Sequence, residues 1–250
     1  MIRKNKKIKT MGLLGLRNTA TVMSTVPKWD PTQEATVEAW WKEGGPYTLN
    51  GSAVSAWNDS SGQDNHLVQA TAGHQPSGVG STAIGKRVIF DGGTSNQHMD
   101  TTSQITLAGE CTIGMRLVVD GTPSNEGLIG DNTEANNFLR INGVSNFHIK
   151  WNNSATKGLD VSGDGIDFTD FDGTIVFTKD GSDVVRCYID GVLMTNVVSS
   201  GMSGDLLIDA VGIRHNHANE FGGFIYEIML FNTSNSALTA NVNKALTAIS

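Results

Sequence analysis

Short stretches in which apolar and polar residues alternate recur along most of the chain, and runs of Gly, Asn, Asp and Ser separate them. In the clearest stretch, Glu110–Gly121, every second residue from Cys111 to Val119 is apolar. A period of two places successive side chains on opposite faces of a β-strand, so the pattern predicts strands. The same pattern predicts strands at Thr36–Lys42, Lys86–Gly92, Asn136–Ile141, Asn146–Trp151, Gly173–Gly181, Asp183–Val198, Leu206–His215 and Gly222–Asn232.

Local sequence also places two tight turns. Between Trp57 and Leu67 lies a run of Asn, Asp, Ser, Gly and Gln residues, most of which tolerate the backbone angles of a reversal. The flanking Trp, Leu and Val favour a half-buried pleated surface, so we expect a hairpin there. The dipeptide Asp190-Gly191 separates two further apolar runs and is a strong signal for a two-residue hairpin.

Only the C-terminal end departs from this pattern. After the polar run 233–236, apolar residues recur every three or four positions, which predicts one short helix. They are Leu238, Val242, Leu246 and Ile249. About ten or more strands in a chain of 250 residues with 29 glycines predict one all-β domain, built as a two-sheet sandwich or a barrel.

Charge divides the chain near residue 29. The first 29 residues contain seven basic and no acidic side chains, whereas the whole chain has a formal charge of −7, so the remainder carries −14. A basic arm on an acidic body is typical of a tail that is solvated or docks onto an acidic surface. We expect an extended attachment arm at 1–29 and the sandwich at 30–250. The arm residues expected to make contacts are Arg3, Lys4, Lys6, Lys7, Lys9, Leu13, Leu14, Leu16 and Arg17.

Three further features concern the compartment. The apolar run "MGLLGL" is shorter than the apolar region of about 7–15 residues in a secretion signal, and Arg17 ends the run, so no signal peptide is expected. No stretch approaches the roughly 18–20 apolar residues of a membrane span, so membrane insertion is not expected. Cys111 and Cys187 lie within alternating stretches, which favours reduced core residues over a disulfide.

Three segments carry a resemblance to a known family. They read "VSAWNDSSGQDNHLVQATAGHQP", "GKRVIFDG" and "FGGFIYEIMLFNTSNSAL". Together they resemble concanavalin A-like, laminin-G-like jelly-roll domains, which implies a two-sheet antiparallel jelly-roll sandwich from about Glu34 to Ser250. Domains of this type with a basic arm and no signal peptide look like virion proteins of tailed bacteriophages. That resemblance implies a multi-copy or homo-oligomeric capsid decoration or tail appendage, made in the host cytoplasm and attached to other virion proteins.

Patterns that resemble catalytic sites are incomplete. The segment Gly80–Arg87 is close to a phosphate-binding loop, but Arg87 replaces the Ser or Thr and a strand follows where a helix is needed. Some jelly-roll relatives are glycoside hydrolases with a Glu-x-Asp-x-x-Glu pattern. Here Glu227 is followed by Met229 and Asn232 at the positions of the other acids. With one carboxylate and no Gly-x-Ser-x-Gly motif, no enzyme activity is expected.

Two groups of residues have ligand types suited to metals. Five aspartates lie within 160–172, and the segment begins like a calcium loop, but Phe171 stands where that loop needs its Glu. Either another calcium geometry or a solvated acidic loop fits them; they are Asp160, Asp164, Asp167, Asp170 and Asp172. His215 and His217 would share a face if extended, but a surface turn explains them as well. No other cofactor is expected.

Aromatic residues are the last candidates. Trp40, Tyr47 and Trp151 could stack on sugar rings, although core packing is expected for two of the three. The leading hypothesis is a non-enzymatic bacteriophage virion structural protein with weak glycan binding. The alternatives are a free-standing bacterial carbohydrate-binding or adhesin module and a degenerate glycoside hydrolase.

Overall fold

The computed structural model describes residues 28–78, 87–93, 95–152, 154–214 and 218–249. Within these residues it contains sixteen β-strands, three 3-10 helices and one α-helix. The strands are β1 (Val37–Trp41), β2 (Tyr47–Asn50), β3 (Ala53–Trp57), β4 (Leu67–Val68), β5 (Val88–Asp91), β6 (Met99–Leu107), β7 (Cys111–Val119), β8 (Glu126–Gly130), β9 (Phe138–Ile141), β10 (Asn146–Lys150), β11 (Lys157–Asp160), β12 (Asp172–Lys179), β13 (Val185–Ile189), β14 (Val192–Leu193), β15 (Leu206–Val211) and β16 (Gly222–Phe231). The helices are η1 (Pro31–Gln33), η2 (Ala72–His74), η3 (Ser162–Asp164) and α1 (Ser236–Thr247).

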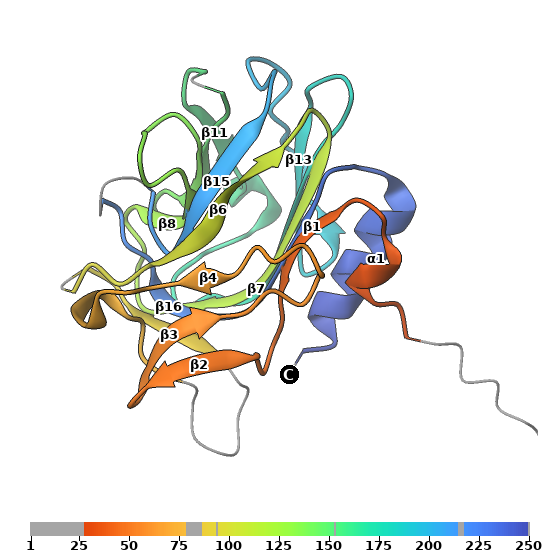
Figure 1. The fold of residues 1–250 in the computed structure, drawn as a ribbon. Helices are drawn as coiled ribbons and strands as arrows, with labels where there is room; N and C mark the ends of the chain where they lie inside the picture. The colour runs from red at the N-terminus through yellow and green to blue at the C-terminus, as the bar shows by residue number, and fades with distance from the viewer. Residues whose placement is uncertain (1–27, 79–86, 94, 153, 215–217, 250) are drawn as a thin grey trace, which may run out of the picture.

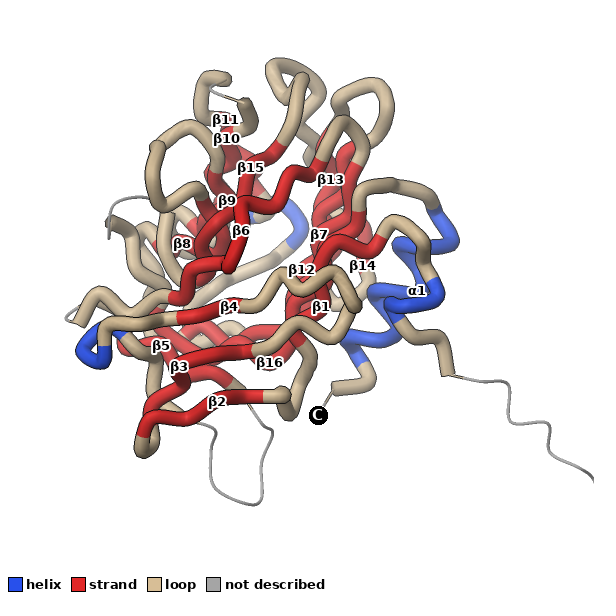
Figure 2. Tube along the Cα trace, viewed as in Figure 1, coloured by secondary structure: helices blue, strands red, loops and turns tan. Residues whose placement is uncertain are grey.

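The strands form two antiparallel sheets that pack face to face (Figures 1 and 2). The seven-stranded sheet has the order β1-β16-β7-β12-β13-β14, and β5 also pairs with β16. The nine-stranded sheet has the order β11-β10-β9-β8-β15-β6-β4-β3-β2. This arrangement confirms the expected all-β jelly-roll sandwich with a short C-terminal helix.

The main core lies between the sheets and comes from side chains that alternate inward. All five apolar residues of the alternation in β7 belong to it, from Cys111 to Val119. Cys111 and Cys187 are buried and not bonded to each other, and burial raises the pKa of the Cys111 thiol to about 12. Both thiols therefore act as small apolar core groups, as predicted.

A second, smaller apolar cluster lies under α1, on the outer face of the seven-stranded sheet (Figure 1). Leu238, Val242 and Leu246 of the helix are buried there, at the spacing that predicted the helix. Gly114 of β7 lies beneath the helix, where an added Cβ would be 2.5 Å from Val242 Cγ1. Close approach of α1 to the sheet therefore depends on the missing side chain of residue 114.

The turn-forming run 58–66 closes the predicted hairpin between β3 and β4. Asp59 organises it: Oδ1 accepts hydrogen bonds from the backbone N–H groups of Ser61 (2.8 Å) and of Trp40 in β1 (2.8 Å). Its Oδ2 accepts from Ser61 Oγ (2.6 Å) and from the backbone N–H of Asn65 (3.2 Å). One carboxylate thus ties β1 of the seven-stranded sheet to a turn of the nine-stranded sheet. The second predicted turn is also confirmed, because β13 pairs with β14 across residues 190–191.

The sequence pattern did not predict four of the observed strands: β2, β6, β8 and β11. In β6 the exposed polar residues 102–104 interrupt the alternation, and β8 contains two glycines, which strand propensities disfavour. Regular alternation also fails in β1, where the register shifts between Val37 and Ala39. As a result Val37 joins the cluster under α1, while Ala39 and Trp41 face the main core.

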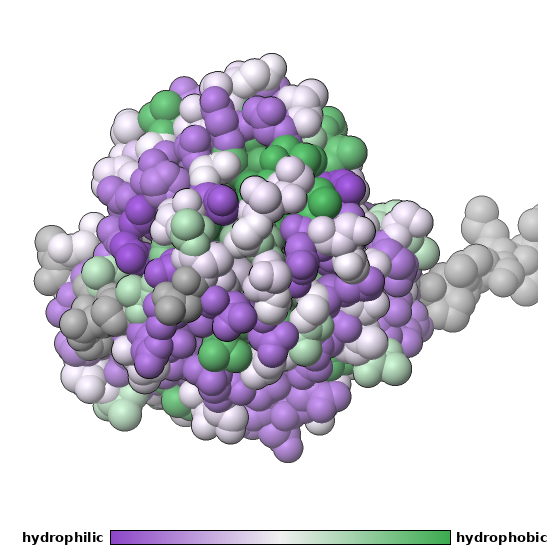
Figure 3. Space-filling model, turned by 90° about the horizontal axis from the view of Figure 1, so that it is seen from above, coloured by the Kyte–Doolittle hydropathy of each residue, from purple (hydrophilic) through white to green (hydrophobic). Residues whose placement is uncertain are grey.

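The face seen from above is largely hydrophilic, and its largest hydrophobic area is compact (Figure 3). Among the described residues, the most exposed large apolar side chains include Val192 and Leu193 of β14, an edge strand of the seven-stranded sheet. No helix in the described part of the chain is long and apolar enough to cross a membrane.

Candidate functional site

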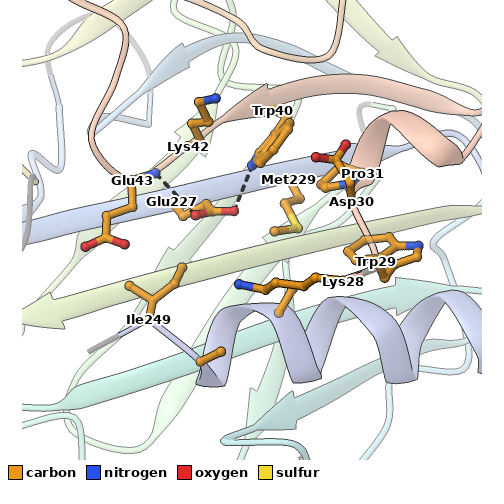
Figure 4. Close-up of a pocket in the computed structure, with 12 residues that line it drawn as sticks. Lys28, Trp29, Asp30, Pro31, Trp40, Lys42, Glu43, Glu227, Met229 and Ile249 are labelled. Atoms are coloured by element: carbon orange, nitrogen blue, oxygen red, sulfur yellow. Dashed lines mark hydrogen bonds between the residues drawn. The ribbon is translucent and has the colours of Figure 1, made fainter. Parts of the chain in front are cut away.

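A pocket of about 280 Å³ lies where β1, β16, the end of α1 and residues 28–31 meet (Figure 4). We call it the Trp40 pocket. Its lining residues are Lys28, Trp29, Asp30, Pro31, Trp40, Lys42, Glu43, Glu227, Met229, Ala245, Ala248 and Ile249.

Strands β1 and β16 position the centre of the pocket. Trp40 pairs with Met229 across the two strands, and both side chains lie on the helix-covered face, opposite the inward-facing Trp41. The Trp40 backbone N–H is bonded to Asp59 Oδ1 at 2.8 Å, so the turn of residues 58–66 holds this part of β1 in place. Of the segments that carry the family resemblance, the one with this turn therefore shapes the pocket without lining it, while the C-terminal one contributes Glu227 and Met229 to the lining.

Glu227 anchors the Trp40 indole. The residue is 6% exposed, and both carboxylate oxygens accept hydrogen bonds: Oε1 from Trp40 Nε1 at 2.7 Å and Oε2 from the backbone N–H of Glu43 at 3.2 Å. Burial raises the pKa of Glu227 above its usual value, while the hydrogen bonds from Trp40 and Glu43 oppose the shift. A buried acceptor with two fixed donors holds the ring in one orientation.

Charged and aromatic groups border this anchor. Lys42 Nζ lies 5.2 Å from the centroid of the Trp40 ring, within cation–π distance. Trp29 Nε1 donates to Glu34 Oε1 at 2.9 Å, and the Trp29 ring packs against Phe231 with centroids 6.2 Å apart. The pocket thus combines two indole rings with acidic and basic side chains.

The arrangement can bind and orient a ligand, and its three carboxyl groups, Asp30, Glu43 and Glu227, do not follow the Glu-x-Asp-x-x-Glu pattern of the hydrolases. Both oxygens of Glu227 are already bonded, and the Glu43 carboxylate points away from Glu227 (Figure 4). At the third position of the hydrolase pattern, Asn232 Nδ2 donates to Glu38 Oε1 at 3.0 Å.

Of the three aromatic candidates, only Trp40 lines the pocket. Trp151 has no exposed surface and packs in the main core, as expected for two of the three candidates, so its ring cannot stack on a sugar. Tyr47 is partly buried, and its ring packs against Trp57 with centroids 5.6 Å apart. Burial also raises the Tyr47 pKa well above its usual range. The structure therefore does not bring these three residues together.

The five aspartates between 160 and 172 do not converge on one point. Each bonds to a different part of the chain. The partners are Ser162 for Asp160, Thr195 for Asp164, Thr169 for Asp167, Gly121 for Asp170 and Arg116 for Asp172. Among the described residues, no group of three or more His, Cys, Asp or Glu side chains is arranged to hold a metal ion. These carboxylates order turns and a salt bridge, which fits the second of the two alternatives, a solvated acidic loop.

Several residues considered in the sequence analysis lie outside the described residues. They are the arm residues from Arg3 to Arg17, most of the loop from Gly80, and His215 and His217. Arg87, the first described residue after this loop, donates a hydrogen bond from Nη1 to the Tyr226 hydroxyl at 2.8 Å. A strand, β5, comes next, as predicted, in place of the helix that a phosphate-binding loop requires.

Sequence reasoning missed Trp29 and Met229 as pocket residues. Trp29 stands at the end of the basic segment, yet its ring packs on the domain. A local signal was present, because Asp30 caps η1 by accepting a hydrogen bond from the backbone N–H of Thr32 at 2.9 Å, and such a cap marks the start of a helical turn next to Trp29. No spacing rule could have joined Met229 to Trp40, since strands distant in sequence bring them together.

Comparisons with known proteins bear on the fold. No family model and no curated protein matches the sequence. Among solved structures, the binding domain of Paraclostridial Mosquitocidal Protein 1 is 12% identical with a TM-score of 0.54, over 88% of this chain and 53% of that one. The botulinum neurotoxin serotype D ligand-binding domain, solved with N-acetylneuraminic acid, is 13% identical with a TM-score of 0.54, over 87% and 51%.

A third similar structure is the binding domain of botulinum neurotoxin DC in complex with rat synaptotagmin II. It is 12% identical with a TM-score of 0.54, over 86% of this chain and 52% of that one. The chain spans about half the length of these structures. At such low identity the likeness shows the fold alone, and it places this chain among jelly-roll β-sandwich domains.

Proposed function

We propose that this chain is a non-catalytic carbohydrate-binding β-sandwich module and that the Trp40 pocket is its binding site. The proposal rests on the partly buried indole of Trp40, which Glu227 holds at 2.7 Å in a cavity of about 280 Å³. Sugar rings stack their C–H faces on indoles, and their hydroxyl groups bond to polar side chains at the rim. The cavity is near the lower end of the usual size of ligand pockets, which suits one sugar unit of a larger glycan.

The similar structures support this choice. The serotype D neurotoxin ligand-binding domain has the same fold and was solved in complex with N-acetylneuraminic acid. A fold alone does not fix a function, so the geometry of the Trp40 pocket is the main support for the proposal.

The test is a glycan-array screen with the full chain, followed by calorimetry on the best ligand. We expect Trp40→Ala to weaken binding at least tenfold, which corresponds to about 1.4 kcal/mol. Tyr47→Ala is the matched control. It removes an aromatic candidate that is also partly exposed but does not line the pocket, so it should leave the affinity unchanged. Binding that depends on Tyr47 and not on Trp40 would overturn the proposal.

The absence of catalysis is a separate part of the proposal. The wild-type chain should release no reducing ends from β-glucans or bacterial polysaccharides, since Met229 and Asn232 stand where the hydrolase pattern has its other two acids. Hydrolysis that Glu227→Gln abolishes would show that the pocket is a glycosidase site.

The division of charge favours one biological setting. Seven basic residues and no acidic ones in the first 29 residues precede a body of net charge −14, which suits attachment of the body to a partner through the arm. We propose that the module is displayed on a bacteriophage particle in this way. Deleting residues 1–25 should leave a folded chain that no longer co-sediments with purified particles. A truncated chain that still decorates particles, or a full chain that binds glycans and never particles, would favour a free-standing module.

A further inference from the structure

A cationic cluster lies on the outer face of the nine-stranded sheet, away from the Trp40 pocket. Arg140 of β9 and His148 of β10 are register partners with outward side chains, because their neighbours Leu139, Ile141 and Ile149 point into the main core. Arg214 follows β15 and reaches the same place. The guanidinium carbons of Arg140 and Arg214 lie 5.4 Å and 4.5 Å from the centroid of the buried Phe138 ring.

The backbone around this cluster is shaped to bring Arg214 onto the sheet. The chain after β15 folds back over β8, where the Gly127 backbone N–H donates to the Asn219 carbonyl at 2.7 Å. A Cβ at Gly127 would lie 2.5 Å from Arg214 N, and one at Gly130 would overlap the Arg214 carbonyl oxygen. The two glycines that weaken β8 as a strand signal therefore make room for Arg214.

The two guanidinium groups share one neutral acceptor. Arg140 Nη1 and Arg214 Nη1 both donate to Asn219 Oδ1, at 3.0 and 3.3 Å. Neither forms a salt bridge with any described residue, whereas Arg116 and Arg186 pair with Asp172 and Asp180 at 2.5 Å. The Nε atoms of Arg140 and Arg214 are buried and have no hydrogen-bond partner among the described residues.

His148 completes the cluster as a neutral group. Arg140 Nη2 lies 2.9 Å from His148 Nδ1, and an arginine can only donate, so Nδ1 must be the acceptor and the ring proton is on Nε2. Burial, together with the charges of Arg140 and Arg214, lowers the pKa of His148, which favours this neutral tautomer. The cluster thus carries two positive charges and spare N–H donors, and no acidic side chain in the described part of the chain is paired with either arginine.

We propose that Arg140 and Arg214 form an oxyanion-binding site for a carboxylate or sulfate group, with the Nε2–H of His148 as an additional donor. Planar guanidinium groups match the paired oxygens of such groups, and two of them side by side are stabilised when an anion lies between them. The site is independent of the Trp40 pocket. The same chemistry is carried by free inorganic anions and by the acidic groups of sugars.

The test compares three probes on the full chain: sodium sulfate against sodium chloride at equal ionic strength, glucuronate, and glucose. At about five times the dissociation constant, a bound anion should raise the melting temperature by about 2–4 °C. Arg140→Gln and Arg214→Gln should each weaken binding at least tenfold. Arg186→Gln removes the same charge from an arginine that has its own carboxylate, so it should bind like wild type.

Two further variants show whether a loss of anion binding comes from the loss of the guanidinium groups. Arg140→Lys retains the charge without the planar fork and should bind more weakly than wild type, which gives a readout if Arg140→Gln fails to fold. Trp40→Ala should leave anion binding unchanged. Binding of both sulfate and glucuronate supports a general oxyanion site, glucuronate alone a carboxylated sugar, and sulfate alone an inorganic or sulfate-bearing ligand. No binding of either anion, equal binding of glucose, or anion binding that survives Arg214→Gln overturns the proposal.

Discussion

The two sheets of the sandwich present opposite kinds of outer face. The helix α1 covers the outer face of the seven-stranded sheet (Figure 1). On this face Val176, Met229 and Phe231 are buried in one cluster with the helix side chains. On the nine-stranded sheet, the outward positions hold partly exposed charged and polar groups, including Arg140 and Asp209. Beneath α1 the first face is therefore a second core, with the Trp40 pocket beside the end of the helix, whereas the second face presents charged groups to solvent.

This difference separates groups that hold the fold from groups that can serve binding. An apolar outer face must be covered by another element, so the helix is part of the stability of the seven-stranded sheet. Charged groups on the other face need no cover. Their unbalanced charges work against folding, which makes them better candidates for a ligand site than the buried groups under α1.

The largest loss of stability is expected from a substitution in the apolar cluster under α1. Leu246→Ala removes a fully buried side chain packed beside Val242, and we expect it to lower the free energy of unfolding by about 2–5 kcal/mol. Leu49→Ala makes the same chemical change at a side chain that is 51% exposed, so it should cost well under about 1 kcal/mol. Urea unfolding of both variants measures the difference. Equal losses would show that α1 is not part of the cooperative unit.

A change in stability of intermediate size is expected from substitution of Asp209 of β15, on the polar face. Burial, reinforced by the charges of Asp131 and Asp100, raises the Asp209 pKa to about 6. The folded state then holds the proton more tightly than the unfolded state, so the stabilising contribution is complete below about pH 4 and is lost as pH rises through 6. At neutral pH the charged Asp209 destabilises the fold.

Asp209→Asn removes this charge and keeps an oxygen that can accept from the backbone N–H of Asn132. We expect a gain on the order of 1 kcal/mol at pH 7.5, allowing for solvent screening of a partly exposed group, and little gain at pH 4. Thermal unfolding at the two pH values tests this. A loss of stability at pH 7.5 would mean that the carboxylate makes favourable contacts that outweigh its burial.

The sequence could predict features that depend on local patterns, but not features that depend on contacts between distant segments. The apolar alternation of β7 and the three-to-four spacing in α1 are local patterns, and both predicted the observed elements. The burial of Lys179 has no local signal: the residue is 1% exposed, and its Nζ bonds to the carbonyl oxygens of Gly109 (2.6 Å) and Gly204 (3.0 Å) and to Asp183 (2.9 Å). Those partners belong to three separate loops.

Binding groups are hidden from sequence for the same reason. Arg140 and Arg214 become neighbours only because two glycines in β8 let a distant segment lie on the sheet. Trp40 could be proposed as an aromatic ligand contact, but its anchor Glu227 is 187 residues away along the chain. Local patterns therefore predict elements and their inward faces, while sites depend on which strands the topology brings together.

The smallest effect is expected in the coupling between Arg140 and Arg214. Two like charges that share the single acceptor Asn219 should repel each other, so a double-mutant cycle of Arg140→Gln and Arg214→Gln should give an unfavourable coupling of about 0.5 kcal/mol in dilute chloride buffer. Added salt should reduce it by screening, and saturating sulfate should make it favourable, because one anion then bonds to both groups. Urea unfolding of the four chains gives the coupling. A favourable coupling in chloride would mean that the two arginines stabilise the fold together. The polar face would then stabilise the fold as the helix-covered face does, and the two faces would differ only in the residues they contain.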